Sequence, residues 1–336
     1  MAVTFQDLIR QNRRQSWLLV TLFILFTVAV AMVLILATMA YVSPGSVQQL
    51  NLGRAGAIGG AAFLVASLFV LFSYYAGDSV ILSVSGARPL QKAQDPQLFN
   101  VVEEMAIAAG VPMPKIYLID DSAPNAFATG RDPQHGIVAI TTGLRTKLSR
   151  DELQGVMAHE MAHIRNFDIR LMMLLAVLIG LIVMMADLFW QTLRFSHYGR
   201  RSSSSSSSSR KSSGGGIEVV IIVVAIILSL IAPLLAQIIQ LAVSRQREYL
   251  ADASAVEFTR NPLGLANALR KIDADPDVLE VANRGTAHLY IANPIKKFEA
   301  RANSMFASHP PIKERIRRLE ALTHAYEQFP SASANA

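Results

Sequence analysis

Cysteine is absent from this sequence. Its absence excludes a disulfide-stabilised scaffold, a thiolate zinc site and a cysteine nucleophile, and the chain needs no oxidising compartment. Charged residues are also scarce, since Asp, Glu, Lys and Arg make up 17% of the chain, against about 25% in an average soluble domain. Apolar residues reach 52%, which indicates that parts of the chain lie in a membrane.

The chain has a formal net charge of +6, but its basic residues do not form a nucleic-acid-binding pattern. Many of them flank apolar segments, where attraction to a membrane surface explains them. No basic patch is interleaved with aromatic residues, and the sequence contains no nucleic-acid-binding motif. We therefore expect contact with the lipid bilayer and no nucleic-acid partner.

Four apolar stretches are each long enough to cross a bilayer, which takes about 20 residues. They cover Trp17–Tyr41, Ala55–Tyr75, Leu171–Trp190 and Ile217–Val243. The first stretch is longer than the apolar region of a cleaved signal peptide, about 7–15 residues, so we interpret it as a retained anchor. Pro233 predicts a kink in the fourth stretch.

The distribution of basic residues predicts the orientation of the first two spans. Three arginines precede the first span: Arg10, Arg13 and Arg14. The loop at 42–53 has no basic residue, so the N-terminus should be cytoplasmic, and residues 78–170 as well. The loop at 191–216 contains five basic residues on the expected outer side, together with a run of serines. Either the rule is weak here, or the last two spans do not cross completely.

Residues 88–170 have the pattern of a compact α/β region. Asp95 and Pro96 predict the start of a helix that ends at Gly110. Three short apolar runs then predict the strands of a small sheet: 115–120, 125–129 and 136–141. Ser149 and Glu152 have the spacing of a capping box, which predicts the start of another helix.

This capped helix contains the sequence His159-Glu160-Met161-Ala162-His163. Histidines at positions i and i+4 lie on one helical face, so their nitrogens can converge on one metal ion. Glu160 can reach the open coordination position and act as the base that activates a water molecule. Such a motif also arises by chance, but its position on a capped helix outside the apolar stretches favours a catalytic site.

A catalytic zinc site needs a third protein ligand, and the best candidate is Glu248. Asp252 follows one helical turn later and can accept the N–H group of a ligand histidine. On its own this pair also fits an exposed acidic helix face. Its position strengthens the prediction, because a hairpin of two spans returns both ligand-bearing helices to the same side of the membrane.

These motifs, in this order between four spans, resemble the HtpX family of membrane metalloproteases, whose wider relatives are the CAAX prenyl proteases. Two further segments carry the resemblance. Residues 124–130 are similar to the family's Asn-Ala-Phe segment, and residues 308–311 are similar to its His-Pro motif.

The resemblance implies a role for each matching residue. His159, His163 and Glu248 would hold one zinc ion per chain, and Glu160 would be the catalytic base. His309 would stabilise the tetrahedral intermediate, while Asp252 and Arg315 would support the site. The remaining implied residues form an edge strand that binds an extended peptide: Asn125, Ala126 and Phe127.

The family's role further implies a zinc endopeptidase that cuts misfolded or damaged membrane proteins during stress. Its catalytic part would face the cytoplasm from a bacterial inner membrane. Membrane proteins, peptides and other copies of the same chain are the expected substrates. On the residues alone, Asn125 is also an ordinary turn residue and His309 an ordinary helix entry.

Three other kinds of membrane protein fit the sequence less well. A metal transporter would place ionisable residues inside the spans, where only Asp187 is found apart from Glu218 at the edge of the fourth. A scaffold with a structural zinc site would have no need of Glu160. An intramembrane protease would place the histidines within an apolar span, whereas this helix carries Arg150, Asp151 and Arg165.

We therefore expect a membrane α-helical protein with an α+β zincin-like catalytic domain. The expected organisation is two spans at 1–80, two catalytic segments at 81–170 and 244–329 on either side of a membrane hairpin at 171–243, and a tail at 330–336. The serine-rich loop at 201–216 has the composition of a flexible linker.

Overall fold

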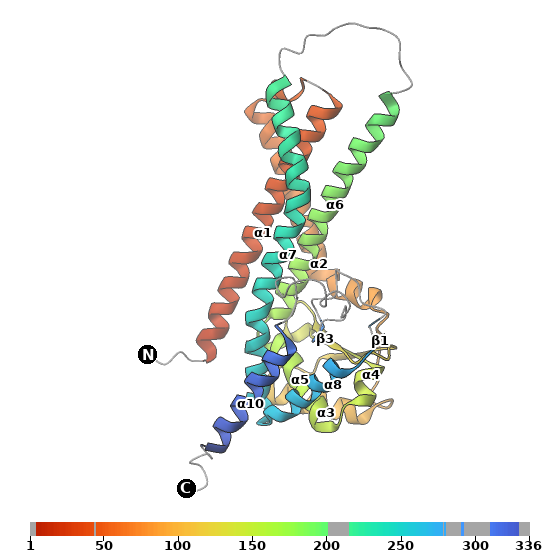
Figure 1. The fold of residues 1–336 in the computed structure, drawn as a ribbon, viewed down its shortest axis with the longest axis vertical. Coiled ribbons are helices and arrows are strands. Elements are labelled where there is room, and N and C mark those ends of the chain that lie inside the picture. The colour runs from red at the N-terminus through yellow and green to blue at the C-terminus, as the bar shows by residue number, and fades with distance from the viewer. Residues whose placement is uncertain are drawn as a thin grey trace. The chain divides into compact units, whose positions relative to one another are not determined.

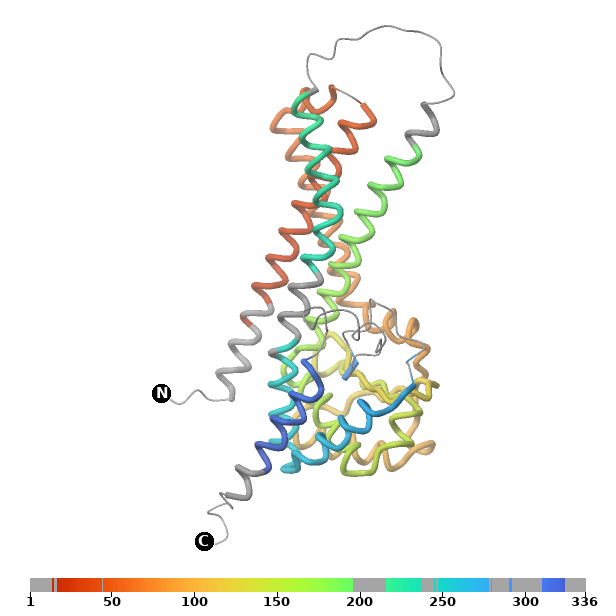
Figure 2. Tube along the Cα trace, in the orientation of Figure 1, coloured from red at the N-terminus to blue at the C-terminus, as the bar shows by residue number. Residues whose placement is uncertain are grey.

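The computed structural model describes residues 5–43, 45–200, 215–277, 279, 290–291 and 310–328 (Figures 1 and 2). The chain divides into two compact units. One, here called the membrane unit, comprises residues 15–73 and 174–237. The other, here called the sheet unit, comprises residues 1–14, 74–173 and 238–336.

Four helices in the described part of the chain are long and apolar enough to cross a membrane. They are α1 (Phe5–Val42), α2 (Leu52–Val84), α6 (Asp168–Arg200) and α7 (Gly215–Thr259). Their apolar parts cover Trp17–Val42, Leu52–Val84, Asp168–Phe195 and Gly216–Ala236. The prediction of four membrane-length helices is confirmed, and helices α1 and α7 continue well beyond their apolar parts.

Exposed leucine and valine side chains cover the outward faces of the membrane-unit helices, among them Leu22, Leu64 and Val224. This is the arrangement that a hydrocarbon solvent favours, because the helices satisfy their own backbone hydrogen bonds and place apolar groups outside. A short 3₁₀ helix, η1 (Val47–Gln49), lies between α1 and α2. The loop before it is tied to the start of α7, where Glu218 Oε1 accepts a hydrogen bond of 2.7 Å from Gly45 N.

The sheet unit contains a four-stranded mixed sheet. Its strands are β1 (Arg88–Pro89), β2 (Lys115–Ile119), β3 (Ala126–Thr129) and β4 (Ile137–Thr141). They lie in the order β1-β2-β4-β3, with β2 and β4 parallel and the other two pairs antiparallel. The three predicted strands are confirmed, and β3 is an edge strand of this sheet.

Side chains alternate between two apolar layers along the strands, as the pleat of a strand requires. In β4, Val138 and Ile140 pack into a core that contains residues from the surrounding helices, including Leu153 and Leu269. On the other face, Ile137 packs into a second core with residues of α2 and with Tyr290. Because both faces are covered, the strands are apolar runs rather than alternating apolar and polar sequences.

The helices of the sheet unit are α3 (Pro96–Ala109), α4 (Thr142–Lys147), α5 (Arg150–Arg165), α8 (Pro262–Ala274) and α10 (Ile312–Gln328), with a 3₁₀ turn η2 (Pro133–His135). Two helices of the sheet unit, α3 and α5, begin where the sequence predicts. Asp95 caps α3 and Gly110 ends it in the left-handed region at φ 67°. Ser149 and Glu152 form both hydrogen bonds of the predicted capping box.

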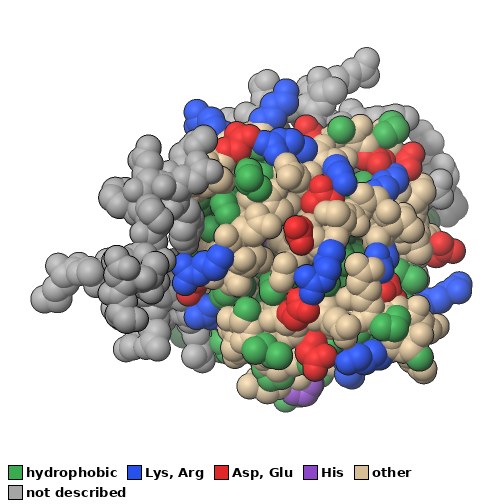
Figure 3. Space-filling view, turned by 90° about the horizontal axis from the view of Figure 1, so that it is seen from below, with side chains coloured by type: hydrophobic (Ala, Val, Ile, Leu, Met, Phe, Trp, Pro, Cys, Tyr) green, Lys and Arg blue, Asp and Glu red, His purple; other side chains and the backbone are tan. Residues whose placement is uncertain are grey.

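Helix α5 is the centre of the sheet unit and packs against α3, α8 and β3 (Figure 1). Its closest neighbour is α8: a Cβ atom on Gly155 would lie 2.6 Å from the Leu265 nitrogen. A larger residue here would force the two helices apart. On the face in Figure 3, acidic and basic side chains are interspersed with scattered apolar ones, as is typical of a surface in water.

Candidate metal centre

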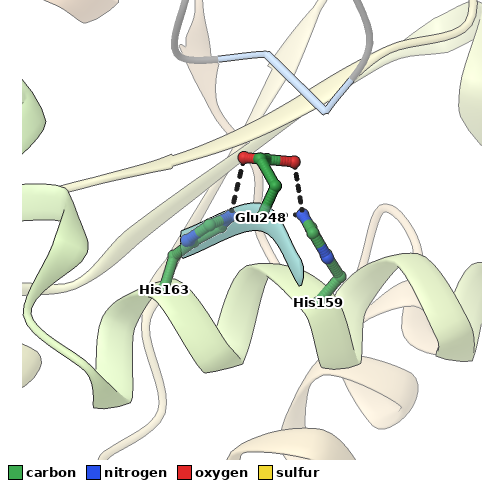
Figure 4. Close-up of side chains that lie close together, drawn as sticks. All are labelled: His159, His163 and Glu248. Carbon is green, nitrogen blue, oxygen red and sulfur yellow. Dashed lines mark hydrogen bonds and ion pairs between the residues drawn. The ribbon is translucent and has the colours of Figure 1, made fainter. Parts of the chain in front are cut away.

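The two histidines of α5 lie on one buried face of the helix (Figure 4). Their rings meet edge to face with centroids 4.7 Å apart, and their Nε2 atoms are 3.1 Å apart. The side chain of His159 is completely buried, whereas 14% of the His163 side chain is exposed. One turn of helix therefore places two imidazole nitrogens at a single point, as the i, i+4 spacing predicts.

Glu248 reaches the same point from α7, 89 positions after His159 in the sequence. Its Oε1 atom lies 3.4 Å from His163 Nε2, and its Oε2 atom lies 3.6 Å from His159 Nε2. Figure 4 shows the carboxylate between the two rings. The sheet unit thus brings together three side chains from two helices that are far apart in sequence.

The three ligand atoms lie within 4.8 Å of one another, which fits a single metal ion. Two imidazoles and one carboxylate are a common protein ligand set of catalytic zinc in hydrolases, in which the fourth position stays open. The chemistry of the donor set therefore fits zinc.

Glu160 lies beside the first histidine and is only 1% exposed. Both of its carboxylate oxygens are buried, and neither has a hydrogen-bond partner among the described residues. Burial raises the pKa of Glu160, because a carboxylate loses solvation in the interior. A buried carboxylate of this kind is costly unless it interacts with a bound group, which supports a site for metal and water here.

Asp252 and Arg315 surround His159. Asp252 Oδ1 lies 3.0 Å from His159 Nδ1, so an N–H group at Nδ1 can be donated to the carboxylate, which leaves Nε2 free for a metal. Arg315 is fully buried and donates to both oxygens of Asp252, at 2.8 and 2.7 Å. It also lies 3.1 Å from Glu248 Oε2, so one guanidinium group contacts a metal ligand and a supporting carboxylate.

The electrostatics of the site favour positive charge between the two rings. Burial opposes protonation of His159, but hydrogen bonds to Asp252 and Glu248 outweigh it and raise the pKa of His159. Burial likewise opposes protonation of His163, yet Asp168 and Glu248 hold its pKa well above the usual range. For Asp252, burial is outweighed mainly by the charge of Arg315, which lowers the pKa of this carboxylate.

Sequence reasoning missed two residues next to His163. The His163 Nδ1 atom lies 3.2 Å from Asp168 Oδ2, and Arg247 Nη1 donates to the other oxygen of Asp168. Both side chains are buried, at 1% and 4% exposure. The available signal in the sequence was the acidic residue Asp168, five positions after His163. In a continuous helix that spacing would place Asp168 on a different face from His163, so periodicity does not predict the contact.

The predicted substrate-binding residues lie at the start of β3. Asn125 precedes the strand and is buried, and its Oδ1 atom accepts a hydrogen bond from Ala126 N. The outer edge of β3 already has a partner, because Phe127 forms an antiparallel bridge with Tyr290 and Ile291 N donates to Ala126 O at 2.9 Å. Ile291 is in turn linked to the metal centre, since its carbonyl accepts a 2.8 Å bond from Arg315.

His309, the predicted oxyanion-stabilising residue, lies outside the described residues. Helix α10 begins three positions later and contributes Arg315 to the site. Of the predicted residues, the structure therefore brings together His159, Glu160, His163, Glu248, Asp252 and Arg315.

Comparison with known proteins identifies one family along most of the chain. The model of peptidase family M48 matches residues 92–323. A protease HtpX homolog from Dictyoglomus thermophilum is 40% identical over 319 residues, covering 95% of this chain and 95% of the relative. One from Dictyoglomus turgidum is 41% identical over 328 residues, covering 97% of each chain.

A crystal structure is also similar to this chain. Ste24p from S. mikatae is 25% identical, with a TM-score of 0.42. The similarity covers 80% of this chain and 64% of the length of Ste24p.

Proposed function

The chain belongs to peptidase family M48, and we propose that it is a zinc endopeptidase that cuts misfolded or damaged membrane proteins at the cytoplasmic face of a bacterial inner membrane. It is a multi-pass membrane metalloprotease of the HtpX type. The observation that carries the proposal is the convergence of His159, His163 and Glu248 beside Glu160. One zinc ion per chain is the proposed cofactor.

When bound, zinc would supply a Lewis acid that polarises the scissile carbonyl and makes water easier to deprotonate. Glu160 takes the proton from the attacking water and later gives it to the leaving amine. Its buried position and raised pKa suit the first step, because a carboxylate with a raised pKa is a stronger base. Asp252 holds His159 in the correct tautomer, and Arg315 holds Asp252 and Glu248.

His309 is the proposed donor to the oxyanion, on the strength of its place in the His-Pro motif at the start of α10. A donor of this kind stabilises the negative charge that develops on the carbonyl oxygen.

Substrate binds as an extended peptide along the outer edge of β3, next to Asn125, Ala126 and Phe127. Main-chain hydrogen bonds to an edge strand give affinity with little dependence on sequence, as quality control requires. Because Tyr290 and Ile291 already pair with this edge, the incoming peptide displaces them from it.

The substrate class follows from the membrane-length helices of the same chain. Membrane anchoring raises the local concentration of membrane-protein substrates and limits access to soluble ones. Another copy of this chain is also a membrane protein, so cleavage in trans is part of the proposal. The arginines in the first turns of α1, before its apolar part, support a cytoplasmic N-terminus and sheet unit. The proposed organisation keeps the two catalytic segments, 81–170 and 244–329, on either side of the membrane hairpin at 171–243.

The test uses the full chain in liposomes with a membrane reporter protein in two forms, one stable and one carrying a destabilising core substitution. We expect faster cleavage of the destabilised form, with fragments that end in its cytoplasmic segments. Equal cleavage of both forms would contradict the quality-control role, and cleavage confined to outer segments would contradict the proposed side. Cleavage of peptides without cleavage of either reporter would contradict the substrate class.

A further inference from the structure

The two metal-ligand histidines have matching surroundings. His159 faces Asp252, whose carboxylate is paired with Arg315. His163 faces Asp168, whose carboxylate is paired with Arg247. Each histidine thus contacts, through Nδ1, a buried carboxylate that a buried arginine neutralises. The first pair belongs to the site as predicted from sequence, whereas the second pair has no assigned role.

An unusual turn brings Asp168 to His163. In a continuous helix, a residue five positions on lies about 140° around the axis and points elsewhere. Here α5 ends at Arg165, and Phe167 adopts φ 60°, before α6 begins at Asp168. A bulky residue rarely adopts a positive φ, and it does so only where the surroundings enforce it. The turn folds the start of α6 back against the second ligand histidine.

Arg247 connects this turn to the third ligand. It precedes Glu248 on α7 and donates to Asp168 Oδ1, so the ion pair joins the start of α6 to the helix that carries the carboxylate ligand. Oδ2 of the same aspartate remains available to His163 Nδ1, at 3.2 Å. The buried Asp168–Arg247 pair therefore constrains the ring orientation of His163 and the position of Glu248.

We propose that Asp168 and Arg247 are positioning residues for the metal centre. Asp168 keeps the proton of His163 on Nδ1 and thereby directs Nε2 toward the metal, and Arg247 fixes Asp168 and the adjacent ligand Glu248. The role rests on the proposed function only in that the three ligands hold zinc. Loss of such an outer partner typically weakens metal binding by about 10–100-fold.

The alternative is an ion pair that only joins α6 to α7. Asp168→Asn separates the two roles, because Asn is a good helix N-terminal residue and nearly isosteric but has lost the charge. Arg247→Lys retains the charge but cannot copy the planar guanidinium geometry. Glu257→Gln is the matched control, since Glu257 of α7 forms a half-exposed ion pair with Arg165 at the end of α5.

The experiment measures zinc affinity of the full chain in detergent by competition with a chromophoric chelator, and the visible spectrum after cobalt substitution. We expect Asp168→Asn to weaken zinc binding by about 10–100-fold and to change the cobalt bands, with a smaller effect of Asp168→Glu and Arg247→Lys. Glu257→Gln should match the wild type in both readouts.

Wild-type zinc affinity and an unchanged cobalt spectrum in Asp168→Asn would overturn the proposal, even if that variant melted at a lower temperature. These readouts need no substrate. If the wild type bound zinc but cleaved nothing, the proposed function would fail while the positioning role of Asp168 would still be decided.

Discussion

At the scale of single residues, the metal centre is a set of buried charges that neutralise one another. Glu248, Asp252 and Asp168 supply negative charge, and Arg315 and Arg247 supply positive charge, all nearly inaccessible to solvent. Isolated charges in a protein interior are very unfavourable, so removing one partner is expected to cost more than replacing a whole pair. A metal ion held by the three ligands would add positive charge to this set.

Glu248→Gln tests the third ligand. An amide oxygen carries no charge and is a much poorer zinc ligand than a carboxylate, so zinc affinity should fall by more than the 10–100-fold that is typical of losing an outer partner. Competition with a chelator measures the loss, and circular dichroism checks that the fold is intact. Unchanged zinc affinity in a folded Glu248→Gln protein would remove Glu248 from the ligand set.

Local spacing explains how much of the site could be predicted from sequence. His159, Glu160 and His163 lie within two helical turns, so periodicity alone places them together. Glu248 required the further argument that two spans return the chain to the same side. Asp168 could not be found in this way, because its contact with His163 depends on the positive φ of Phe167, and phenylalanine carries no signal for that conformation.

At the scale of elements, α5 determines the geometry of the metal centre. Its start is fixed by the capping box of Ser149 and Glu152, and Lys271 of α8 donates a 2.7 Å bond to the same glutamate. Burial disfavours the Glu152 carboxylate, but the hydrogen bonds from Lys271 and Ser149 outweigh burial and lower its pKa. The cap therefore fixes the beginning of the helix and joins it to α8.

Glu152→Gln should lower the stability of the α5 start in a pH-dependent way. Glutamine can keep the capping bond but not the charge. Near pH 7 the free energy of unfolding should therefore fall by about 0.5–1 kcal/mol. A lowered folded-state pKa stabilises the fold above the unfolded value, 4.5, and this contribution is lost as the pH falls through the folded value.

Hydrogen exchange of the α5 amides should therefore show a difference between wild type and Glu152→Gln that shrinks with acidification. A difference that stayed constant down to low pH would show that the charge of Glu152 is not its cause. Glu103→Gln removes an exposed ion pair with Lys92 and is the control. It should have little effect on hydrogen exchange at neutral or at acidic pH.

The outer edge of β3 offers a second test at this scale. Ile291→Pro removes the N–H group that bonds Ala126 O but keeps the carbonyl that accepts from Arg315. If substrate displaces this segment, weaker internal pairing should lower KM by a few-fold and leave kcat close to the wild-type value. Ile291→Val, which keeps the N–H group, is the control. An unchanged KM in Ile291→Pro would show that peptide does not compete for this edge.

Strands and helices of the sheet unit were predictable because turn residues and caps separate apolar runs of the right length. The two-residue strand β1 and the bridge at Tyr290 were not, because each is too short to produce a period. Their pairing depends on the assembled sheet rather than on their own sequences.

At the scale of the whole molecule, the chain combines membrane-length helices with a unit that has the charged surface of a soluble protein. Helix α7 contributes to both, because its apolar part, Gly216–Ala236, and the ligand Glu248 belong to the same helix. The sequence predicted the spans from composition alone, but it could not show that span and ligand share an element.

Single-cysteine labelling tests the predicted orientation, and the absence of native cysteine makes every label unique. Ser46→Cys and Ser205→Cys should react with an impermeant thiol reagent added outside intact cells, and Glu103→Cys should react only after the cells are opened. Reaction of Ser205→Cys only in opened cells would show that the last two spans do not cross completely, which the five basic residues of that loop would then explain.

The most direct test of the central claim compares wild type with Glu160→Gln, each purified as the full chain and assayed on a fluorescent membrane-protein reporter with and without chelator. We predict that wild-type cleavage is lost on chelation and restored by zinc. Glu160→Gln should bind about one zinc ion per chain and cleave at least about 10²-fold more slowly, because it lacks the proton acceptor. Cleavage by zinc-loaded Glu160→Gln at the wild-type rate would contradict the assignment of Glu160 as the base.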